Sequence, residues 1–166
     1  MEKLIKSPDF FIVGAQKCGT STVHNWLNQD SRINLPRYKE THFFSTHYSK
    51  GMNWYLKQFP DFYNGQYVLR GEVDPSYMFF PKVFERIKRD TDNPKFIFIF
   101  RKPIDRSYSH YIMSKFRGCE LLSFSDAINA ENQRLKDKDI FSFTHFSYLK
   151  RSKYSEQLDT FLNFFD

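Results

Sequence analysis

The hydrophobic and polar positions along the chain follow two alternating patterns. Short apolar runs of strand length are followed by stretches in which apolar residues recur every three or four positions, as on one face of a helix. The strand candidates are Phe10–Gly14, Tyr67–Val73 and Lys95–Arg101. The third, KFIFIFR, is apolar almost throughout, which predicts a strand covered on both faces. Strands that alternate with helices favour an α/β fold with a mainly parallel central sheet.

Four helices are predicted from the spacing of apolar side chains. One follows a glycine-containing loop after the first strand, and two follow Pro81 and Pro103, where proline suits a first helical turn. The last lies near the end of the sequence. The apolar positions that define these four faces are Val23, Trp26 and Leu27; Val83, Phe84 and Ile87; Ile104, Tyr108, Tyr111 and Ile112; and Tyr154, Leu158, Phe161, Leu162 and Phe165.

The 166 residues have the length of one domain, and we predict a single domain over residues 1–166. An α/β domain commonly carries a further strand after such a final helix, so we expect this domain to be incomplete at its C-terminal end. No apolar run approaches the ~20 residues that span a bilayer, and the N-terminal segment lacks the apolar core of a signal peptide. Two cysteines suit a reducing compartment, so the expected location is cytoplasmic.

The formal net charge is +6 and the pI is about 9.2. Such a surface favours anions such as nucleotides, acidic glycans, nucleic acids or anionic membranes, although solubility alone explains the excess equally well. The basic residues are not interleaved with aromatic residues at a recognition spacing. We therefore expect no nucleic-acid partner.

The segment GAQKCGTST, residues 14–22, carries the most specific chemistry. Its two glycines have the spacing of a P-loop, but a nucleotide-binding P-loop has lysine directly after the second glycine. Here Thr20 takes that place, and Lys17 lies inside the loop. Backbone N–H groups at a helix N-terminus attract anions, and the hydroxyls of Thr20, Ser21 and Thr22 can donate to phosphate oxygens. A glycine turn before a helix needs no ligand, so a structural role stays open.

The longer segment PDFFIVGAQKCGTSTVHNWL resembles a known loop. It is similar to the 5′-phosphosulfate loop of sulfotransferases that use 3′-phosphoadenosine-5′-phosphosulfate (PAPS), especially the Golgi-type heparan sulfate and carbohydrate branch and its bacterial relatives. In that family the loop lysine contacts the phosphosulfate, and the hydroxyl residues hold the 5′-phosphate. The resemblance implies a catalytic Lys17 and a donor-binding segment of Lys17, Cys18, Gly19, Thr20, Ser21 and Thr22.

The segment KETHFF, residues 39–44, contains a candidate base. Transfer to a hydroxyl requires a base within hydrogen-bond reach of it, and if the segment is extended, Glu40 and His42 point the same way. Taken alone, such residues are more often polar surface groups. The segment resembles the E-x-H-F-F of heparan sulfate sulfotransferases, which implies Glu40 as the catalytic base, with His42 orienting or stabilising. That branch often has an aspartate after HFF, where this chain has Ser45, so acceptor recognition is expected to differ.

The segment GEVDPSY, residues 71–77, resembles the G-E-K-(T/S)-P-x-Y strand end of the same family. Val73 stands in place of the lysine, which in the heparan sulfate branch lies near the transferring sulfate. Lys17 must then supply more of the positive charge near the sulfate, or another cationic side chain must supply it. Asp74 stands where threonine or serine is usual, and a cap before Pro75 explains it at least as well as catalysis does.

The segment FIFIFRKPIDRSYSHY resembles the family's 3′-phosphate segment, a strand that ends in Arg-x-Pro with a serine eight residues beyond the arginine. Arg101 and Ser109 fit these positions. A guanidinium at a strand's carboxyl end can hold a phosphate with two donors, and ligands of open α/β sheets bind at that edge.

The ordered resemblances run from Pro8 to the end and imply a sulfotransferase fold, a P-loop-NTPase-like three-layer sandwich. They imply PAPS as donor, PAP as product, no metal, and an acceptor hydroxyl on a carbohydrate or a small molecule. Two alternatives stay open. A non-catalytic PAP- or nucleotide-binding module would suit an incomplete domain. A P-loop kinase would use Asp74 as a Mg²⁺ ligand, and dependence on Mg²⁺–ATP would distinguish it.

Overall fold

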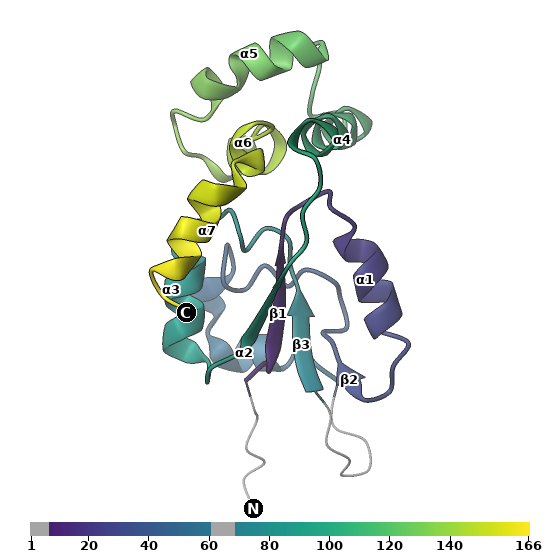
Figure 1. Ribbon diagram of the computed structural model, residues 1–166, viewed down its shortest axis with the longest axis vertical. Helices are drawn as coiled ribbons and strands as arrows, with labels where there is room; N and C mark the ends of the chain where they lie inside the picture. Colours follow the sequence, from purple (N-terminus) through teal and green to yellow (C-terminus); the bar gives the residue numbers. More distant parts are fainter. Residues whose placement is uncertain (1–6, 61–68) are drawn as a thin grey trace, which may run out of the picture.

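The computed structural model describes residues 7–60 and 69–166. A four-stranded parallel sheet of order β2-β3-β1-β4 lies at its centre (Figure 1). The strands are β1 (Phe10–Gly14), β2 (Ile33–Asn34), β3 (Leu69–Val73) and β4 (Lys95–Phe98). The helices are α1 (Thr20–Leu27), α2 (Met52–Leu56), α3 (Val83–Asp90), α4 (Pro103–Phe116), α5 (Phe124–Arg134), α6 (Ile140–His145) and α7 (Tyr154–Leu162).

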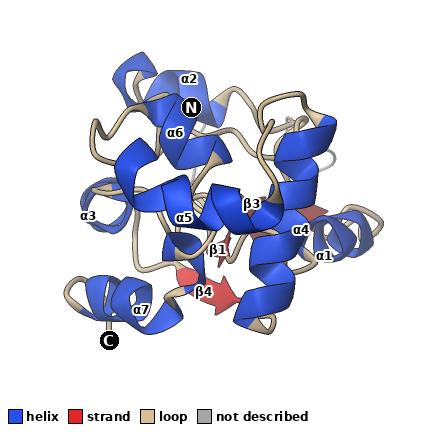
Figure 2. Cartoon of the chain, turned by 90° about the horizontal axis from the view of Figure 1, so that it is seen from above, coloured by secondary structure: helices blue, strands red, loops and turns tan. Residues whose placement is uncertain are grey.

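Helices cover both faces of the sheet, so the predicted α/β fold with a parallel sheet is confirmed. β1 is buried along its whole length, and its side chains alternate between two hydrophobic clusters. Phe11 and Val13 face the cluster that includes α3 and α7, whereas Phe10 and Ile12 face the side of α1. Helices α4, α5 and α6 lie above the sheet in Figure 1, and the view from above shows them across its upper edge (Figure 2).

Aromatic rings fill the larger cluster and explain the high phenylalanine content. Phe43 and Phe44 are almost fully buried there, and Phe43 stacks on Tyr55 with ring centroids 4.6 Å apart. Phe44 meets Phe11 of β1 edge to face at 5.6 Å. Such pairs contribute about 0.5–1.5 kcal/mol beyond their buried area. The HFF part of the KETHFF segment is therefore fastened to the sheet, and the polar residues before it acquire a fixed position.

β4 is shorter than the predicted strand Lys95–Arg101. Its regular pairing ends at Phe98, because the register with β1 shifts between Ile12 and Gly14. Ile99 still exchanges backbone hydrogen bonds of 2.7 Å with the end of β1. The carboxyl end of β4 thus remains beside the loop that follows β1.

The prediction that β4 is covered on both faces is wrong. Phe96 and Phe98 pack against Phe161 of α7, but Ile97 on the other face is 44% exposed. β4 forms an edge of the sheet within the described residues, and the predicted residues Tyr67 and Val68 of the second strand lie outside them.

The predicted apolar face of α4 is also wrong in part, since Ile104 is 71% exposed and Tyr108 is 50% exposed. The buried face is largely polar instead. Four of its side chains hydrogen-bond to the segment 144–152, where backbone oxygens and a serine hydroxyl accept the bonds, and Tyr111 donates to the Leu122 carbonyl. The residues of this face are Arg106, Ser107, His110, Tyr111 and Ser114. Apolar spacing could not reveal a helix that packs through hydrogen bonds to backbone carbonyls.

The other helices agree with the prediction more closely. Val83, Phe84 and Ile87 of α3 are buried, and Val23 and Leu27 of α1 pack on the sheet, while Trp26 is exposed. In α7, Phe161 is buried, whereas Leu162 is exposed and Phe165 lies beyond the helix end. The patterns did not predict β2, α2, α5 or α6, of which β2 has only two residues. No helix of the described residues is long and apolar enough to cross a membrane.

Candidate active site

A cleft of about 790 Å³ opens where the carboxyl ends of β1 and β3 meet. The loop after β1, the segment around residues 39–46 and the turn after β3 form one part of its wall. Helices α4 and α6 and the residue Arg151 form the other part. Segments distant in the sequence therefore meet at the edge where open α/β sheets bind ligands.

The loop after β1 presents its anion-binding features to this cleft. Gly19 precedes α1 with φ of 91°, and Lys17 also has a left-handed φ of 70°. Lys17, Gly19, Thr20 and Ser21 all line the cleft. Burial, followed by the nearby cations Arg117 and Arg101, lowers the pKa of Lys17. The helix N-terminus, the lysine and two hydroxyls thus converge on one space that suits a phosphate or sulfate group.

Two other residues of the predicted donor segment lie outside the lining of this cleft within the described chain. Cys18 is buried, with its Sγ 3.8 Å from the Tyr154 hydroxyl. Thr22 is exposed on α1. A direct role of Cys18 and Thr22 in holding the donor stays a prediction.

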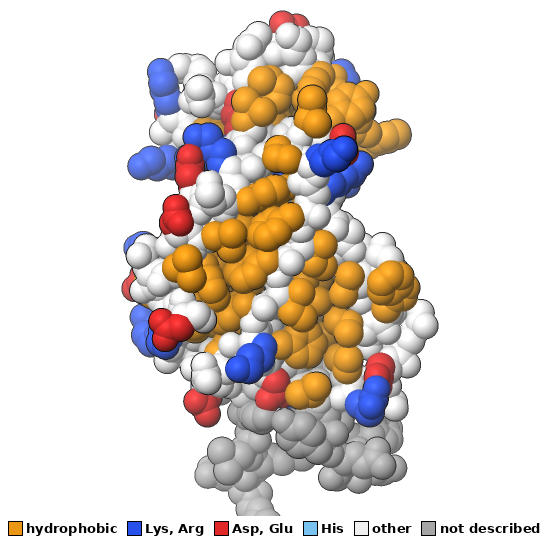
Figure 3. Space-filling model, viewed as in Figure 1, with side chains coloured by type: hydrophobic (Ala, Val, Ile, Leu, Met, Phe, Trp, Pro, Cys, Tyr) orange, Lys and Arg blue, Asp and Glu red, His pale blue; other side chains and the backbone are white. Residues whose placement is uncertain are grey.

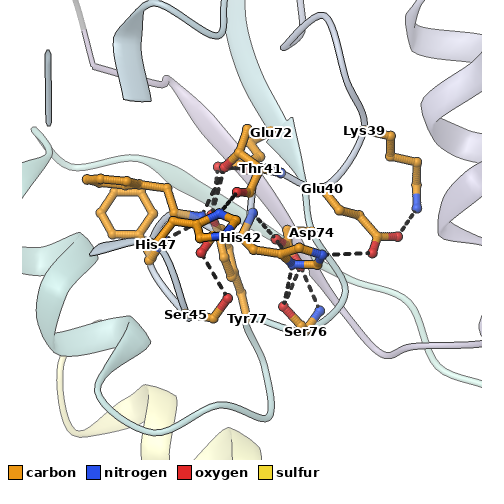
Figure 4. Close-up of polar contacts among 12 residues, drawn as sticks. Lys39, Glu40, Thr41, His42, Ser45, His47, Glu72, Asp74, Ser76 and Tyr77 are labelled. Carbon is orange, nitrogen blue, oxygen red and sulfur yellow. Dashed lines mark hydrogen bonds and ion pairs between the residues drawn. The ribbon is translucent and has the colours of Figure 1, made fainter. Parts of the chain in front are cut away.

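The KETHFF segment brings Glu40 and His42 together, but not in the extended conformation that we supposed. Both residues have left-handed backbones, with φ of 65° and 53°. The backbone turns because Thr41, buried between them, is bonded to Glu72 through its N–H and its hydroxyl. His42 Nε2 lies 3.8 Å from Glu40 Oε2, and both side chains line the cleft (Figure 4). The Lys39 ammonium forms an ion pair with the other side of the Glu40 carboxylate.

Asp74 holds His42 from beneath. Its Oδ2 accepts hydrogen bonds from the ring Nδ1 and from the backbone N–H of His42, both at 2.9 Å. Its Oδ1 accepts from the N–H and the hydroxyl of Ser76. The bond to Asp74 raises the pKa of His42, and although burial opposes it, the bonds from His42 and Ser76 lower the pKa of Asp74. Asp74 therefore caps the turn before Pro75 and also orients the histidine.

Glu72 is a fully buried carboxylate that joins β3 to the KETHFF segment. Its Oε1 accepts from Thr41, and its Oε2 accepts from the hydroxyls of Tyr55 and Tyr77 at 2.6 Å and 3.1 Å. Burial, with the negative charge of Asp74, raises the pKa of Glu72 to about 7. Glu72 and Tyr77 match the strand-end motif, and their bonds to Thr41 and Phe44 hold the KETHFF segment in place.

Glu40, His42 and Asp74 together could offer ligands to a metal ion, because one ligand atom of each lies within 4.8 Å of the others. These atoms already serve one another. His42 Nδ1 is bonded to Asp74, and Glu40 is paired with Lys39. The Nε2 of His42 has no hydrogen bond to Asp74 and faces Glu40 instead. The expectation of a metal-free reaction stays a prediction.

Val73 turns away from the cleft into the cluster with Phe10, Ile12 and Leu35. Position 73 therefore supplies no positive charge to the cleft, where the family motif would have a lysine. Arg117, at the end of α4, lines the cleft and is the charged residue with the largest effect on the pKa of Lys17. No motif marks Arg117 in the sequence, since it lies sixteen positions beyond the arginine of the strand-end motif.

Arg101 and Ser109 come together as their motif predicts. Both line a second cavity of about 540 Å³ against α4, and Ser109 also borders the main cleft. Arg101 is about half exposed, and its Nε lies 3.9 Å from the Asp105 carboxylate. Ser109 thus joins the two cavities, which suits a ligand that carries one anionic group in each.

A parallel sheet with a glycine loop, a helix N-terminus and clustered cations at its carboxyl edge is typical of α/β proteins that bind phosphate-type ligands. The profile of the family described as "Sulfotransferase domain" matches residues 7–165. The chain belongs to the sulfotransferase domain family.

Proteins similar to the chain include two curated sulfotransferases and a sulfotransferase of known structure. The membrane-associated sulfotransferase kil1 of Dictyostelium discoideum is 32% identical over 113 residues, which are 68% of this chain and 24% of that protein. The human heparan sulfate glucosamine 3-O-sulfotransferase 5 is 33% identical over 106 residues, 63% of this chain and 30% of that protein. The crystal structure of a sulfotransferase from Alicyclobacillus acidocaldarius superposes with a TM-score of 0.81 at 28% identity, over 96% of this chain and 69% of that one. The chain spans less than a third of the length of these two curated relatives.

Proposed function

We propose that the chain transfers the sulfuryl group of PAPS to a hydroxyl of an acceptor and releases PAP. The observation that carries the proposal is the meeting of Lys17 and Glu40 in one cleft. Lys17 lies in an anion-binding loop at a helix N-terminus, and Glu40 lies on the separate KETHFF segment. A cation for the donor and a base for the acceptor therefore face the same space, as group transfer requires.

In this reaction Glu40 accepts the proton of the acceptor hydroxyl as the hydroxyl oxygen bonds to sulfur. The bond between sulfur and the bridging phosphate oxygen breaks at the same time. Lys17 and the N–H groups at the start of α1 neutralise the charge that grows on that oxygen. His42, held by Asp74, fixes the Glu40 side of the cleft and places a positive charge beside the carboxylate when it is protonated.

Arg101 and Ser109 would hold the 3′-phosphate of the donor. They lie in the cavity that adjoins the main cleft, so a donor bound by both groups would be fixed in one register. A guanidinium and a hydroxyl are suitable donors for a phosphate dianion. No residue of this arrangement requires a metal ion, and the proposed reaction proceeds without one.

A carbohydrate is the proposed acceptor. Two similar proteins are heparan sulfate glucosamine 3-O-sulfotransferases by name, and the residues that border Glu40 here include the cation Lys39. The side of the cleft beyond His42 carries hydroxyls of Ser45, Thr46 and Ser76, which can bond to sugar hydroxyls.

Release of PAP from PAPS, measured with a panel of hydroxyl-bearing sugars and with EDTA present, tests this proposal. In the Glu40→Gln variant we expect transfer to fall by about 10²–10⁴-fold, because the amide cannot take the proton. PAP affinity should stay within about twofold, since Glu40 does not hold the donor. Unchanged turnover in the variant would exclude Glu40 as the base.

A further inference from the structure

The wall of the cleft contains a buried arginine, Arg151, that forms no ion pair with any carboxylate of the described residues. It is 2% exposed, and it lies in the 3-10 turn that precedes α7. Its Nε donates to the Ser147 hydroxyl at 2.8 Å, and its Nη2 donates to the Phe143 carbonyl at 3.1 Å. Within residues 7–60 and 69–166, no atom accepts a hydrogen bond from Nη1, and no carboxylate pairs with the guanidinium.

This arrangement is unfavourable for the protein alone. A buried charge without a counter-charge loses several kcal/mol of hydration. A cation–π contact with the ring of Phe79, whose centroid lies 4.3 Å from the guanidinium carbon, offsets part of this lost hydration energy. Burial, and then repulsion by Arg106, lowers the pKa of Arg151 to about 9, so the side chain remains charged at neutral pH. An anion that enters the cleft would satisfy both the free N–H and the charge.

The position of Arg151 favours the acceptor over the donor. Arg151 lines the cleft together with Phe80 and Thr144. Its guanidinium carbon lies 4.3 Å from the ring of Phe79 and 5.5 Å from that of Phe80, in the segment that directly follows the Asp74–Ser76 turn holding His42. Arg151 therefore belongs to the end of the cleft where the base and its histidine lie.

We propose that Arg151 recognises a negatively charged group on the acceptor, a carboxylate or a sulfate, through a hydrogen bond from Nη1. The inference rests on the proposed function, because it assigns a specificity role within the same cleft. An acceptor bound in this way carries an anionic group fixed near the hydroxyl that Glu40 deprotonates. The rigid neighbours of Arg151 hold its guanidinium in place before the ligand arrives, so no ordering of a long side chain opposes binding.

Paired sugars that differ in one charged group test the role of Arg151. Protein saturated with PAP is titrated with methyl glucuronide, glucose 6-sulfate and the neutral methyl glucoside, and binding is followed by NMR. We expect wild-type protein to prefer at least one anionic sugar to the neutral one by roughly tenfold or more. The anion that is preferred distinguishes a carboxylate from a sulfate.

Two variants separate recognition from folding. Arg151→Met keeps the apolar volume and removes the donor, and Arg151→Lys keeps the charge and removes the planar fork. We expect the preference to disappear in Arg151→Met and to weaken in Arg151→Lys, while both still bind PAP. The matched control Arg89→Met changes an exposed arginine of α3 and should leave the preference unchanged.

Two results would overturn the proposal for Arg151. One is an equal affinity of wild-type protein for charged and neutral sugars, or no binding of either charged sugar. The other is a preference that persists in Arg151→Met. If PAP itself fails to bind wild-type protein, the proposed sulfuryl transfer fails first, so the two failures are distinguishable.

Discussion

At the scale of single residues, the central feature of the cleft is His42, which lies between a buried carboxylate, Asp74, and a partly exposed one, Glu40. Asp74 is fully buried and bonded to the His42 ring and to Ser76, whereas Glu40 is partly exposed and faces the cleft. Because Asp74 is buried and hydrogen-bonded, it can only orient the His42 ring. Glu40 is partly exposed and can contact a substrate. The carboxylate partner of His42 is Asp74, directly after β3, while the Ser45 hydroxyl donates to the His42 carbonyl.

The Asp74→Asn variant tests this orientation. The bond to Asp74 raises the pKa of His42, so in wild-type protein the ring stays protonated to a higher pH than a free histidine. The amide removes the negative charge, and burial, which disfavours the cation, then lowers the pKa of His42 below its wild-type value. An NMR titration of the His42 ring measures the shift. An unchanged His42 pKa would show that Asp74 does not govern the ring.

At the scale of the elements, the phosphate loop and its two flanking elements could be predicted from the sequence. β1 has the predicted bounds Phe10–Gly14, and α1 begins directly after Gly19, because a buried apolar run and a glycine turn are local signals. The burial of α4 could not be predicted, since its buried face is polar and its partners are backbone carbonyls of a distant segment. The spacing of apolar residues carries no information about hydrogen bonds to distant backbone carbonyls.

The candidate site was predictable only where a motif marked it. Lys17, Glu40 and His42 were found from motifs, and the structure brings all three to one cleft. Arg117 and Arg151 were missed, because each reaches the cleft through tertiary packing of α4 and of the turn before α7. The contacts that create their roles involve residues tens of positions away in the chain.

Glu72 fastens the KETHFF segment to β3, and its titration should appear in the stability of the fold. The folded-state pKa of Glu72 is raised to about 7, so folding favours the neutral carboxyl. Stabilisation by this group is complete below its unfolded pKa, about 4.3, and is lost as the pH rises to about 7. The Glu72→Gln variant stays neutral throughout.

Urea unfolding at several pH values measures this effect. From pH 4.5 to pH 7 we expect the stability of Glu72→Gln to rise relative to that of wild-type protein. The variant also disturbs the bonds from Tyr55 and Tyr77, which adds a loss that does not depend on pH. A stability difference that stays constant over this range would contradict a raised pKa for Glu72.

Gly71 tests the packing between β1 and β3. It pairs with Phe10 across the two strands, and a Cβ at Gly71 would lie 2.0 Å from a ring carbon of Phe10. We expect Gly71→Ala to lower the free energy of unfolding by about 1–3 kcal/mol, because the Phe10 ring must leave its buried position. Urea unfolding measures the change.

Gly118→Ala is the control for this packing effect. A Cβ at Gly118 meets open space, although its φ of 70° disfavours alanine. That backbone strain alone should cost about 1 kcal/mol. If Gly71→Ala were no less stable than Gly118→Ala, the close approach of Phe10 to β3 would be contradicted.

At the scale of the whole molecule, the described residues form a cleft at the carboxyl edge of the sheet and an exposed apolar face. Figure 3 shows hydrophobic side chains in a broad band over the face that carries β4 and α7 in Figure 1. Ile97 and Phe100, at or just beyond β4, and Leu162 of α7 are among the exposed apolar residues. The expectation of a further strand beyond α7 stays a prediction, and the edge position of β4 within the described chain is compatible with it.

We propose that the cleft at the end of β1 holds an adenosine phosphosulfate donor without a metal. Calorimetric titration of the 166-residue chain with PAP in EDTA, with Mg²⁺–ATP titrated separately, tests it most directly. We predict saturable PAP binding that Lys17→Ala and Arg101→Ala each weaken by about tenfold or more, while the exposed control Arg89→Ala leaves it unchanged. Absence of PAP binding, or preference for Mg²⁺–ATP, would contradict the account.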